Sequence, residues 1–223
     1  MQFACDDSGM DTDSSPSPAA TDTLPLFPLG TVVFPGSLLP LQIFELRYLS
    51  MVGECERQGT DFGVVTLTRG AEVHQPGGPA EQFEPVGTRM RLEKVQRPRP
   101  GLLHIACRAL DTFEIVQSAQ RSDGLWQAQV RRLPPEPALP VPEHLHYLSG
   151  QMAQVLAQLQ DDTLDPQPWP RPWPLDDCAW LSQRWSELLP WPTPMKYRLL
   201  ALRDPLMRLE LVGDSVLPQS PAA

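Results

Sequence analysis

The sequence predicts an α+β protein, with a small curled β-barrel and one short helix followed by a helical bundle. Two observations carry this expectation. Up to about residue 134 the apolar residues follow mostly strand patterns, whereas beyond the proline-rich segment 134–142 they take helical spacing. Proline makes up 27 of 223 residues and gathers in connecting segments, which indicates stiff loops rather than general disorder.

The first strands are expected within LPLFPLGTVVFPGSLLPLQIFELRY, residues 24–48. This stretch is rich in aliphatic and aromatic side chains, but its four prolines and two glycines would repeatedly interrupt a membrane-spanning helix. Each proline also removes a donor from a sheet ladder, which argues against a long central strand. We therefore expect short extended pieces at the rim of a barrel, 23–27 and 38–44, joined by a tight corner at 34–36.

A short amphipathic helix is expected over 45–59, because apolar residues recur every three positions and Gly59 follows them. A loop over 71–82, rich in Gly and Pro, is expected to be mobile, and a change of alternation at Val95 predicts a bulge. Several strands with short turns indicate an antiparallel barrel or curled sheet. The strands are expected over 61–70, 86–96, 102–117 and 125–130.

In the second half, apolar residues keep helical spacing from Leu145 to Leu159, and a further helix is expected over 175–189. Thr193-Pro194 and Asp204-Pro205 each place an N-cap residue before a proline at the first helical position, so two more helices should begin there. The expected organisation is a disordered tail (1–22), the barrel subdomain (23–134), the bundle subdomain (135–213) and a C-terminal tail (214–223).

The charge balance argues against general affinity for nucleic acid. The net charge is −9, and the first 23 residues contribute five aspartates and no basic residue. These residues also lack the charged and apolar regions of a signal peptide. Cys5, Cys55, Cys107 and Cys178 are scattered, which indicates reduced thiols rather than a zinc site. We expect a cytoplasmic protein with no membrane association.

The opening stretch, read as L-P-L-F-P-L, V-V-F-P-G and L-P-L-x-I-F-E-x-R-Y, resembles the N-terminal substrate-binding domain of the Lon protease family. The stand-alone bacterial proteins built from that domain are the most similar. The resemblance extends through FGVVTL and VGT to LLPWPTPMKYRLLALRDPLMRLELV, covering about 24–213. It departs from the family pattern at Leu46, which replaces a proline, and at Ala109 and Thr112, which replace Gly and Arg. It implies a PUA-like pseudo-β-barrel followed by a helical bundle.

The sequence lacks the motifs that would indicate an ATPase or a serine hydrolase. The sequence has no G-x-x-x-x-G-K-[ST] phosphate loop and no G-x-S-x-G elbow, so we expect no ATP hydrolysis, no catalytic residues and no cofactor. His74 falls in the expected loop, and His104 lies on a strand without an evident partner. His144 and His146 open a helix, where residues two apart diverge, so we expect no metal site.

The favoured function is a non-enzymatic module that binds exposed hydrophobic segments of unfolded proteins, as the resemblance implies. A small curled sheet is not expected to bury all the large side chains of the opening stretch, so some should line a groove. Glu45 and Arg47 are interpreted as a structural pair that holds the helix start. A protease or chaperone is a candidate partner. The predicted substrate contacts are Phe34, Leu38, Leu39, Phe44 and Tyr48.

Two alternatives belong to other classes. A PUA-like RNA binder would use the basic strip of Arg89, Arg91, Lys94, Arg97 and Arg99, although this strip lacks aromatic residues for base stacking. The other alternative is an unrecognised hydrolase. Trp-Pro pairs at Trp169, Trp173 and Trp191 are expected to cap the bundle or close the seam between its helices and the barrel.

Overall fold

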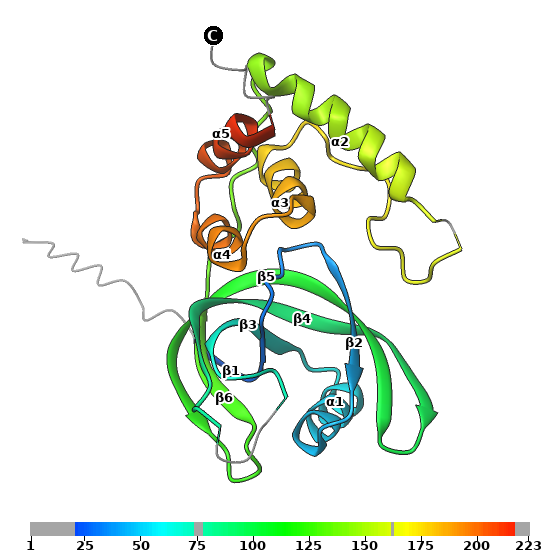
Figure 1. Ribbon diagram of the computed structural model, residues 1–223, viewed down its shortest axis with the longest axis vertical. Helices are drawn as coiled ribbons and strands as arrows, with labels where there is room; N and C mark the ends of the chain where they lie inside the picture. Colours follow the sequence, from blue (N-terminus) through cyan, green and yellow to red (C-terminus); the bar gives the residue numbers. More distant parts are fainter. Residues whose placement is uncertain (1–20, 74–77, 162, 217–223) are drawn as a thin grey trace, which may run out of the picture.

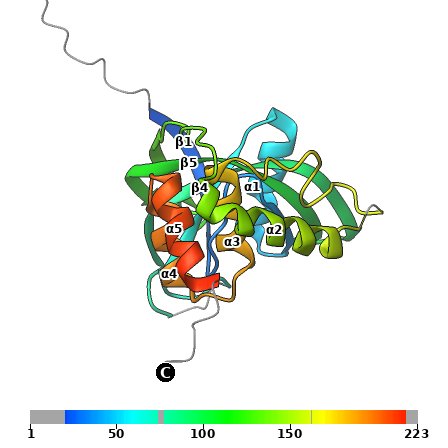
Figure 2. The ribbon, with the colours of Figure 1, turned by 90° about the horizontal axis from the view of Figure 1, so that it is seen from above.

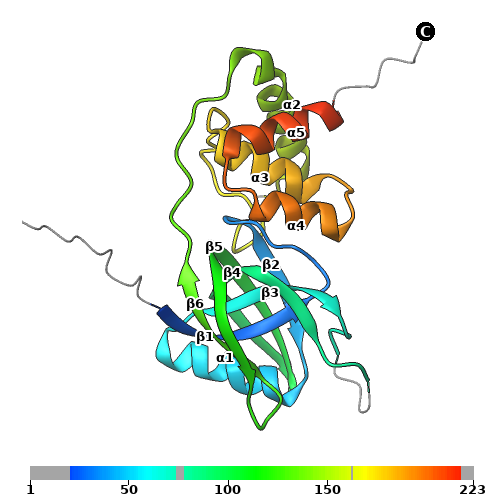
Figure 3. The ribbon, with the colours of Figure 1, turned by 90° about the vertical axis from the view of Figure 1, so that its left-hand side faces the viewer.

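The computed structural model describes residues 21–73, 78–161 and 163–216. Most of the expected tails over 1–22 and 214–223 and part of the expected loop with His74 lie outside it, but residues 21 and 22 belong to the first strand and 214–216 to the last helix. A β-barrel forms one end of the molecule and a group of helices the other (Figure 1). The chain crosses between them through an extended segment after the last strand, which runs along one side (Figure 3). The α+β class predicted from the sequence is confirmed.

Five of the strands close into a barrel. The sheet order is β2-β5-β4-β3-β1-β6, and β6 pairs back onto β5. Strand β2 is the extra strand, because it pairs with the first half of β5 while β6 pairs with the second half. The barrel is not wholly antiparallel as expected, since β1 and β3 run parallel. The strands are β1 (Thr21–Leu29), β2 (Leu38–Ile43), β3 (Phe62–Arg69), β4 (Gln82–Arg99), β5 (Leu102–Gln120) and β6 (Trp126–Arg132).

Strand β1 corrects the expectation that its prolines confine it to a short piece at the rim. It has nine residues and lies between β3 and β6. It changes partner at Leu26, since 21–26 pair with β6 and 26–29 pair with β3. Pro25 therefore has a neighbour only in β6 and Pro28 only in β3, so each missing N–H can face the side without a strand. The expected bulge is present, as the register of β4 shifts between Leu92 and Lys94.

The barrel interior is closed by helix α1 (Leu46–Gln58) and by the aromatic ring of Phe113. Helix α1 ends at Gly59, whose positive φ of 64° suits glycine, and buries Met51, Val52 and Cys55 in the barrel core. The Phe113 ring lies against the backbone of Gly63 and Gly87; a Cβ at Gly87 would stand 2.5 Å from its Cζ atom. The absence of a side chain at Gly87, in the VGT motif, therefore allows the Phe113 ring to pack in the core.

The second half contains helices that lie over one end of the barrel (Figure 2). Helix α3 is capped by Asp177, whose side chain accepts from the Trp180 amide at 2.7 Å, and Asp204 caps α5 in the same way through two amides. Helix α4 begins one residue earlier than expected, with Pro192 as N-cap instead of Thr193. The helices are α2 (His146–Leu159), α3 (Cys178–Leu188), α4 (Thr193–Ala201) and α5 (Pro205–Val216).

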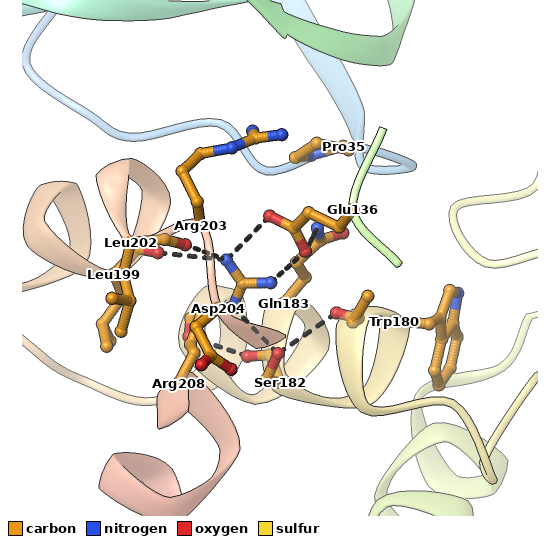
Figure 4. A network of polar contacts seen from close by, with 12 residues as sticks. Pro35, Glu136, Trp180, Ser182, Gln183, Leu199, Leu202, Arg203, Asp204 and Arg208 are labelled. Carbon is orange, nitrogen blue, oxygen red and sulfur yellow. Dashed lines mark hydrogen bonds and ion pairs between the residues drawn. The ribbon is translucent and has the colours of Figure 1, made fainter. Parts of the chain in front are cut away.

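A buried ion pair ties the extended segment to the helices (Figure 4). The Arg208 guanidinium on α5 is 1% exposed and pairs with the carboxylate of Glu136. Its Nε donates to Ser182 Oγ at 2.9 Å, and its Nη1 donates to the carbonyls of Leu199 and Leu202 at 3.2 and 2.9 Å. Since a buried charge needs several partners, this network fixes the path of the chain between barrel and helices.

The seam between barrel and helices is packed and hydrogen bonded. Phe34, in the β1–β2 connection, is fully buried beside Leu199 and Leu200 of α4. Arg184 of α3 is also fully buried and donates to the Pro35 carbonyl at 2.6 Å. As expected, the tryptophans take part in this packing: Trp169, Trp173 and Trp191 lie against the helical core, and Trp191 also contacts the cluster around Phe34.

Candidate binding cleft beside strand β2

Strand β2 has a free edge. Within the described residues it pairs with β5 alone, in a register that places Leu39 opposite Cys107 and Leu41 opposite Ile105. The Ala109 amide donates to the Ser37 carbonyl at 2.9 Å just before this ladder. Bonded and non-bonded positions alternate in an antiparallel pair, so Leu38, Pro40 and Gln42 turn their main-chain groups away from β5. Pro40 stands where it interrupts no hydrogen bond to β5.

An apolar cleft of about 230 Å³ lies along this edge, and we call it the β1–β2 cleft. Phe44 and Val73, at its mouth, are 53% and 48% exposed, so apolar side chains meet the solvent where the cleft opens. The lining residues come from β1 (Phe27, Leu29), β2 (Pro40, Leu41, Gln42, Ile43), the start of α1 (Phe44, Glu45, Tyr48) and the loop after β3 (Glu72, Val73).

A second hollow, of about 350 Å³, lies on the outer face of β2 and is called the outer groove. Leu38 and Pro40 form one wall, and the loop from Leu164 to Pro168 forms the other. Lys94 crosses between them, donating to the Asp165 carbonyl at 2.7 Å. Because Pro40 lines both hollows, they meet across the edge strand.

A third hollow, of about 340 Å³, lies between barrel and helices, near Pro35 and Trp180. Its charged groups are already engaged in the fold. Asp177 caps α3, Asp111 pairs with Arg89, and Arg203 donates to Thr112 Oγ1 at 3.0 Å. The β1–β2 cleft differs because main-chain groups of β2 face it.

The structure separates the predicted substrate contacts. Phe44 lies at the mouth of the β1–β2 cleft and Leu38 in the outer groove. Leu39 points to the other face of β2 and packs partly against the barrel core, since neighbouring strand residues face opposite sides. The prediction for Phe34 is wrong: it is fully buried in the seam, because the bundle covers the β1–β2 connection.

Tyr48 also corrects the sequence prediction. It is 2% exposed and its ring lies 4.0 Å, centroid to centroid, from that of Phe27. Tyr48 lies in the first turn of α1 and its ring packs into the barrel core, so it forms the floor of the β1–β2 cleft rather than an open contact surface. Burial, and then the charges of Glu81, Glu45 and Glu72 against that of Arg47, raise the pKa of Tyr48.

Glu45 and Arg47 do form a pair, with Arg47 Nε 3.2 Å from Glu45 Oε2. Arg47 has a second and nearer carboxylate partner, Glu81, which the sequence did not predict. Arg47 Nη2 lies 2.9 Å from Glu81 Oε1. Trp126 Nε1 donates to the other Glu81 oxygen at 2.6 Å, and Arg47 Nη1 donates to the Gly124 carbonyl at 3.0 Å. Burial lowers the pKa of Arg47, but the hydrogen bond to Glu81 and the nearby charges outweigh it and raise the pKa.

No local signal in the sequence marks Glu81 as this partner. It lies 34 positions from Arg47, within a segment rich in Gly and Pro that predicts only a loop. The ion pair forms because the connection between β3 and β4, which contains Glu81, lies beside Arg47 at the start of α1 in the folded chain. Charge pairs of this kind are set by topology, not by spacing along the chain.

The described histidines and cysteines have places in the fold that point to no catalytic or metal site. His144 pairs with Glu210, His146 contacts the Val141 carbonyl, and His104 lines the outer groove. Burial raises the pKa of the Cys107 thiol to about 12 and also raises those of Cys55 and Cys178. Among the described residues no group of three or more His, Cys, Asp or Glu side chains is placed to hold a metal.

The basic strip is largely paired within the protein. Arg89 pairs with Asp61 and Asp111, and Arg91 also pairs with Asp61. These carboxylates compete with phosphate groups for the guanidinium donors. The pairing extends to Lys94 with Asp165 and Arg97 with Glu56. In the part of the chain that the structure describes, no helix has the length and apolar character needed to cross a membrane.

The fold and the cleft define a class: a pseudo-barrel with an attached helical bundle and an apolar cleft at a free strand edge. The family model of the ATP-dependent protease La (LON) substrate-binding domain matches residues 23–216, and the chain belongs to this family. The resemblance seen in the sequence is thereby confirmed. The family is that of a substrate-recognition domain, distinct from the catalytic part of the protease.

Two curated relatives are Lon proteases. The one from Anaeromyxobacter dehalogenans (strain 2CP-C) is 31% identical over 100 residues, and Lon protease 2 from Myxococcus xanthus is 30% identical over 100 residues. Each alignment covers 44% of this chain and 12% of the relative, so the chain corresponds to a small part of either protein.

Solved structures show the same fold. The Lon N-terminal domain protein from Xanthomonas campestris superposes with a TM-score of 0.67 at 29% identity, covering 88% of this chain and 99% of that one. The N-terminal domain of the Mycobacterium avium complex Lon protease gives 0.58 at 16% identity, covering 88% of this chain and 100% of that domain. The second comparison supports the fold alone.

Proposed function

We propose that this protein is a non-enzymatic recognition module that binds exposed hydrophobic segments of unfolded proteins in the β1–β2 cleft. Membership of a substrate-binding family supports a recognition role. The observation that carries the assignment of the site is the pair of exposed side chains, Phe44 and Val73, at the mouth of an apolar cleft. Phe34 is excluded from the contact set by its burial.

The size of the cleft sets the expected affinity. A hollow of about 230 Å³ accepts one or two large apolar side chains. Burial of each contributes roughly 1.5–3 kcal/mol, and the cost of ordering the peptide offsets much of this gain. A single segment should therefore bind weakly, with a dissociation constant on the order of 1 mM or above. Weak, broad recognition suits a protein that samples many unfolded clients.

The proposal includes the setting in which binding occurs. We propose that the module works in the cytoplasm without ATP and passes its clients to a protease or chaperone. Cys55, Cys107 and Cys178 are free thiols, which fits a reducing compartment. Recognition by apolar contact needs no nucleotide, because the free energy comes from the buried surface itself.

The test is binding of labelled peptides from unfolded proteins, measured by fluorescence anisotropy. Phe44→Ala should weaken binding about fivefold to tenfold, since it removes most of an apolar side chain from the contact. Met207→Ala is the matched control, because Met207 on α5 is also 53% exposed and lies outside the cleft. Equal loss in both variants, or no peptide binding by the unaltered protein, would contradict the proposal.

Salt separates this function from RNA binding. Capture of an apolar peptide without charged side chains should change little between about 50 and 200 mM salt, whereas RNA binding through several phosphates would fall steeply. The ion pairs of Arg89, Arg91, Lys94 and Arg97 lead us to expect no strong RNA complex. A salt-sensitive complex with labelled RNA, together with no peptide binding, would favour the RNA alternative.

A further inference from the structure

The β1–β2 cleft combines a free strand edge with an acidic mouth, and these two features together specify its ligand more narrowly than apolarity alone. The inference rests on the proposed function, because it concerns the same cleft. It adds the conformation in which a segment binds and the charge that the segment carries.

Main-chain groups of β2 face the cleft. The ladder to β5 uses the alternate positions Leu39, Leu41 and Ile43, so Gln42 turns its N–H and C=O toward the free edge, and Pro40 its C=O. Both residues line the cleft. A peptide strand aligned beside β2 would find an acceptor, a donor and a second acceptor at the spacing of a sheet ladder.

The charges around the cleft are unbalanced. Arg47 pairs with Glu45 and Glu81, and Glu72 lines the cleft nearby, so three carboxylates and one guanidinium give this group a formal net charge of −2 (one minus three). Glu72 is exposed at the rim, where its Oε1 accepts from the Gly30 amide at 2.6 Å. Among the described residues that line the cleft, none is Lys, Arg or His.

These charges also act on Tyr48, at the floor of the cleft. Burial is the main cause that raises the pKa of Tyr48; of the nearby charges, Arg47 lowers it, and Glu81, Glu45 and Glu72 raise it. Because three carboxylates outnumber the one guanidinium here, a negative charge brought into the cleft would be repelled, whereas a Lys or Arg side chain near the exposed Glu72 would be attracted.

We propose that the β1–β2 cleft binds an extended peptide segment as an added strand on β2, with apolar side chains in the cleft and a Lys or Arg beside them at the acidic rim. The first residues of this chain have the wrong charge for that role, since they carry Asp6, Asp7, Asp11 and Asp13 and no basic residue. A second copy of the chain is the other occupant to be tested.

The charge preference is tested with three labelled decapeptides that share one apolar centre of Val, Leu and Phe and differ only in flanking Lys, Ser or Glu. At about 20 mM salt the Lys peptide should bind about tenfold more tightly than the Glu peptide, and at about 500 mM salt the two should converge. Glu72→Gln should reduce the difference, while Glu143→Gln, an exposed carboxylate outside the cleft, should leave it unchanged.

Strand addition has its own readout. N-methylation of one alternate set of amides in the Lys peptide should abolish binding, and methylation of the other set should be tolerated, because only one set faces β2. Hydrogen exchange of the Gln42 amide should slow at least tenfold when the peptide is bound, as its free N–H gains a partner.

The outcomes separate the two levels of inference. Peptides that bind equally whatever their flanking charge, with no effect of methylation, would overturn this inference and leave hydrophobic recognition standing. Failure of all three peptides to bind would contradict hydrophobic recognition itself. The protein could instead self-associate, with Phe44→Ala abolishing the association and none of the peptides competing with it. That result would identify a second copy of the chain as the occupant and would also overturn the inference.

Discussion

The ring of Tyr48 lies 4.0 Å, centroid to centroid, from the ring of Phe27, at the floor of the β1–β2 cleft. This contact makes the same side chain part of the barrel core and part of the cleft. The Arg47 guanidinium lies 4.5 Å from the Tyr48 centroid, so the charged network of the rim rests on this ring as well. Packing of the barrel and shape of the cleft therefore depend on one residue.

Tyr48→Ala should lower the free energy of unfolding by about 3 kcal/mol, since it removes a buried aromatic ring that its neighbours cannot replace. Phe44→Ala, on the exposed side of the same cleft, should leave the urea midpoint nearly unchanged. Urea unfolding followed by tryptophan fluorescence measures both. Similar stabilities for the two variants would show that the floor and the mouth of the cleft are not distinct.

Gly87→Ala should lower the free energy of unfolding by roughly 1–3 kcal/mol, because the added methyl group would overlap the Phe113 ring and the Val64 carbonyl. Gly150→Ala is the control. Gly150 lies in α2 with no atom within 4 Å of a Cβ, so alanine there should stabilise the protein by roughly 0.5–1 kcal/mol. The opposite signs are compared by chemical denaturation, and a neutral Gly87→Ala would contradict the packing argument.

Glu136→Ala should destabilise the protein by about 3–5 kcal/mol, since it leaves the Arg208 charge buried without its carboxylate. Glu210 lies on α5, as Arg208 does, but its pair with His144 is exposed, so Glu210→Ala should leave the unfolding midpoint unchanged. Thermal and urea unfolding of both variants give the comparison. Equal midpoints would mean that the network in Figure 4 adds nothing to stability.

Alkaline pH should destabilise the fold through Cys107. Burial raises the pKa of its thiol from 9.0 to about 12, so between these values the unfolded chain loses a proton that the folded chain keeps. The contribution of Cys107 to the free energy of unfolding is fully present below about pH 9. Above that pH it declines by at most about 1.4 kcal/mol per pH unit. Urea midpoints between pH 8 and 10.5 should fall less steeply for Cys107→Ala than for the unaltered protein. Parallel curves would contradict this assignment.

Much of the fold follows from local patterns in the sequence. Helix α1 ends at Gly59 and α5 begins at Pro205 behind its Asp204 cap, both as predicted, because caps and glycine termini act within a few residues. The length of β1 was not predictable in this way. Pro25 and Pro28 are tolerated there only because β1 changes partners at Leu26, and partner choice depends on strands far along the chain.

For the candidate site too, the sequence predicted some features, and others depended on the tertiary structure. The sequence identified Leu38, Leu39, Phe44 and Tyr48 as members of one apolar segment, together with Phe34, but composition does not say which face each takes. Strand alternation sends Leu38 and Leu39 to opposite sides of β2.

By itself the sequence determined the fold class, the family and the apolar segment from which the cleft is made, because these depend on periodicity, caps and a long irregular motif. Tertiary structure alone decided that Phe34 is core, that Glu81 partners Arg47 and that the edge of β2 stays free among the described residues. The reason is physical: burial and charge pairing depend on distances between segments tens of residues apart, and barrel closure sets those distances.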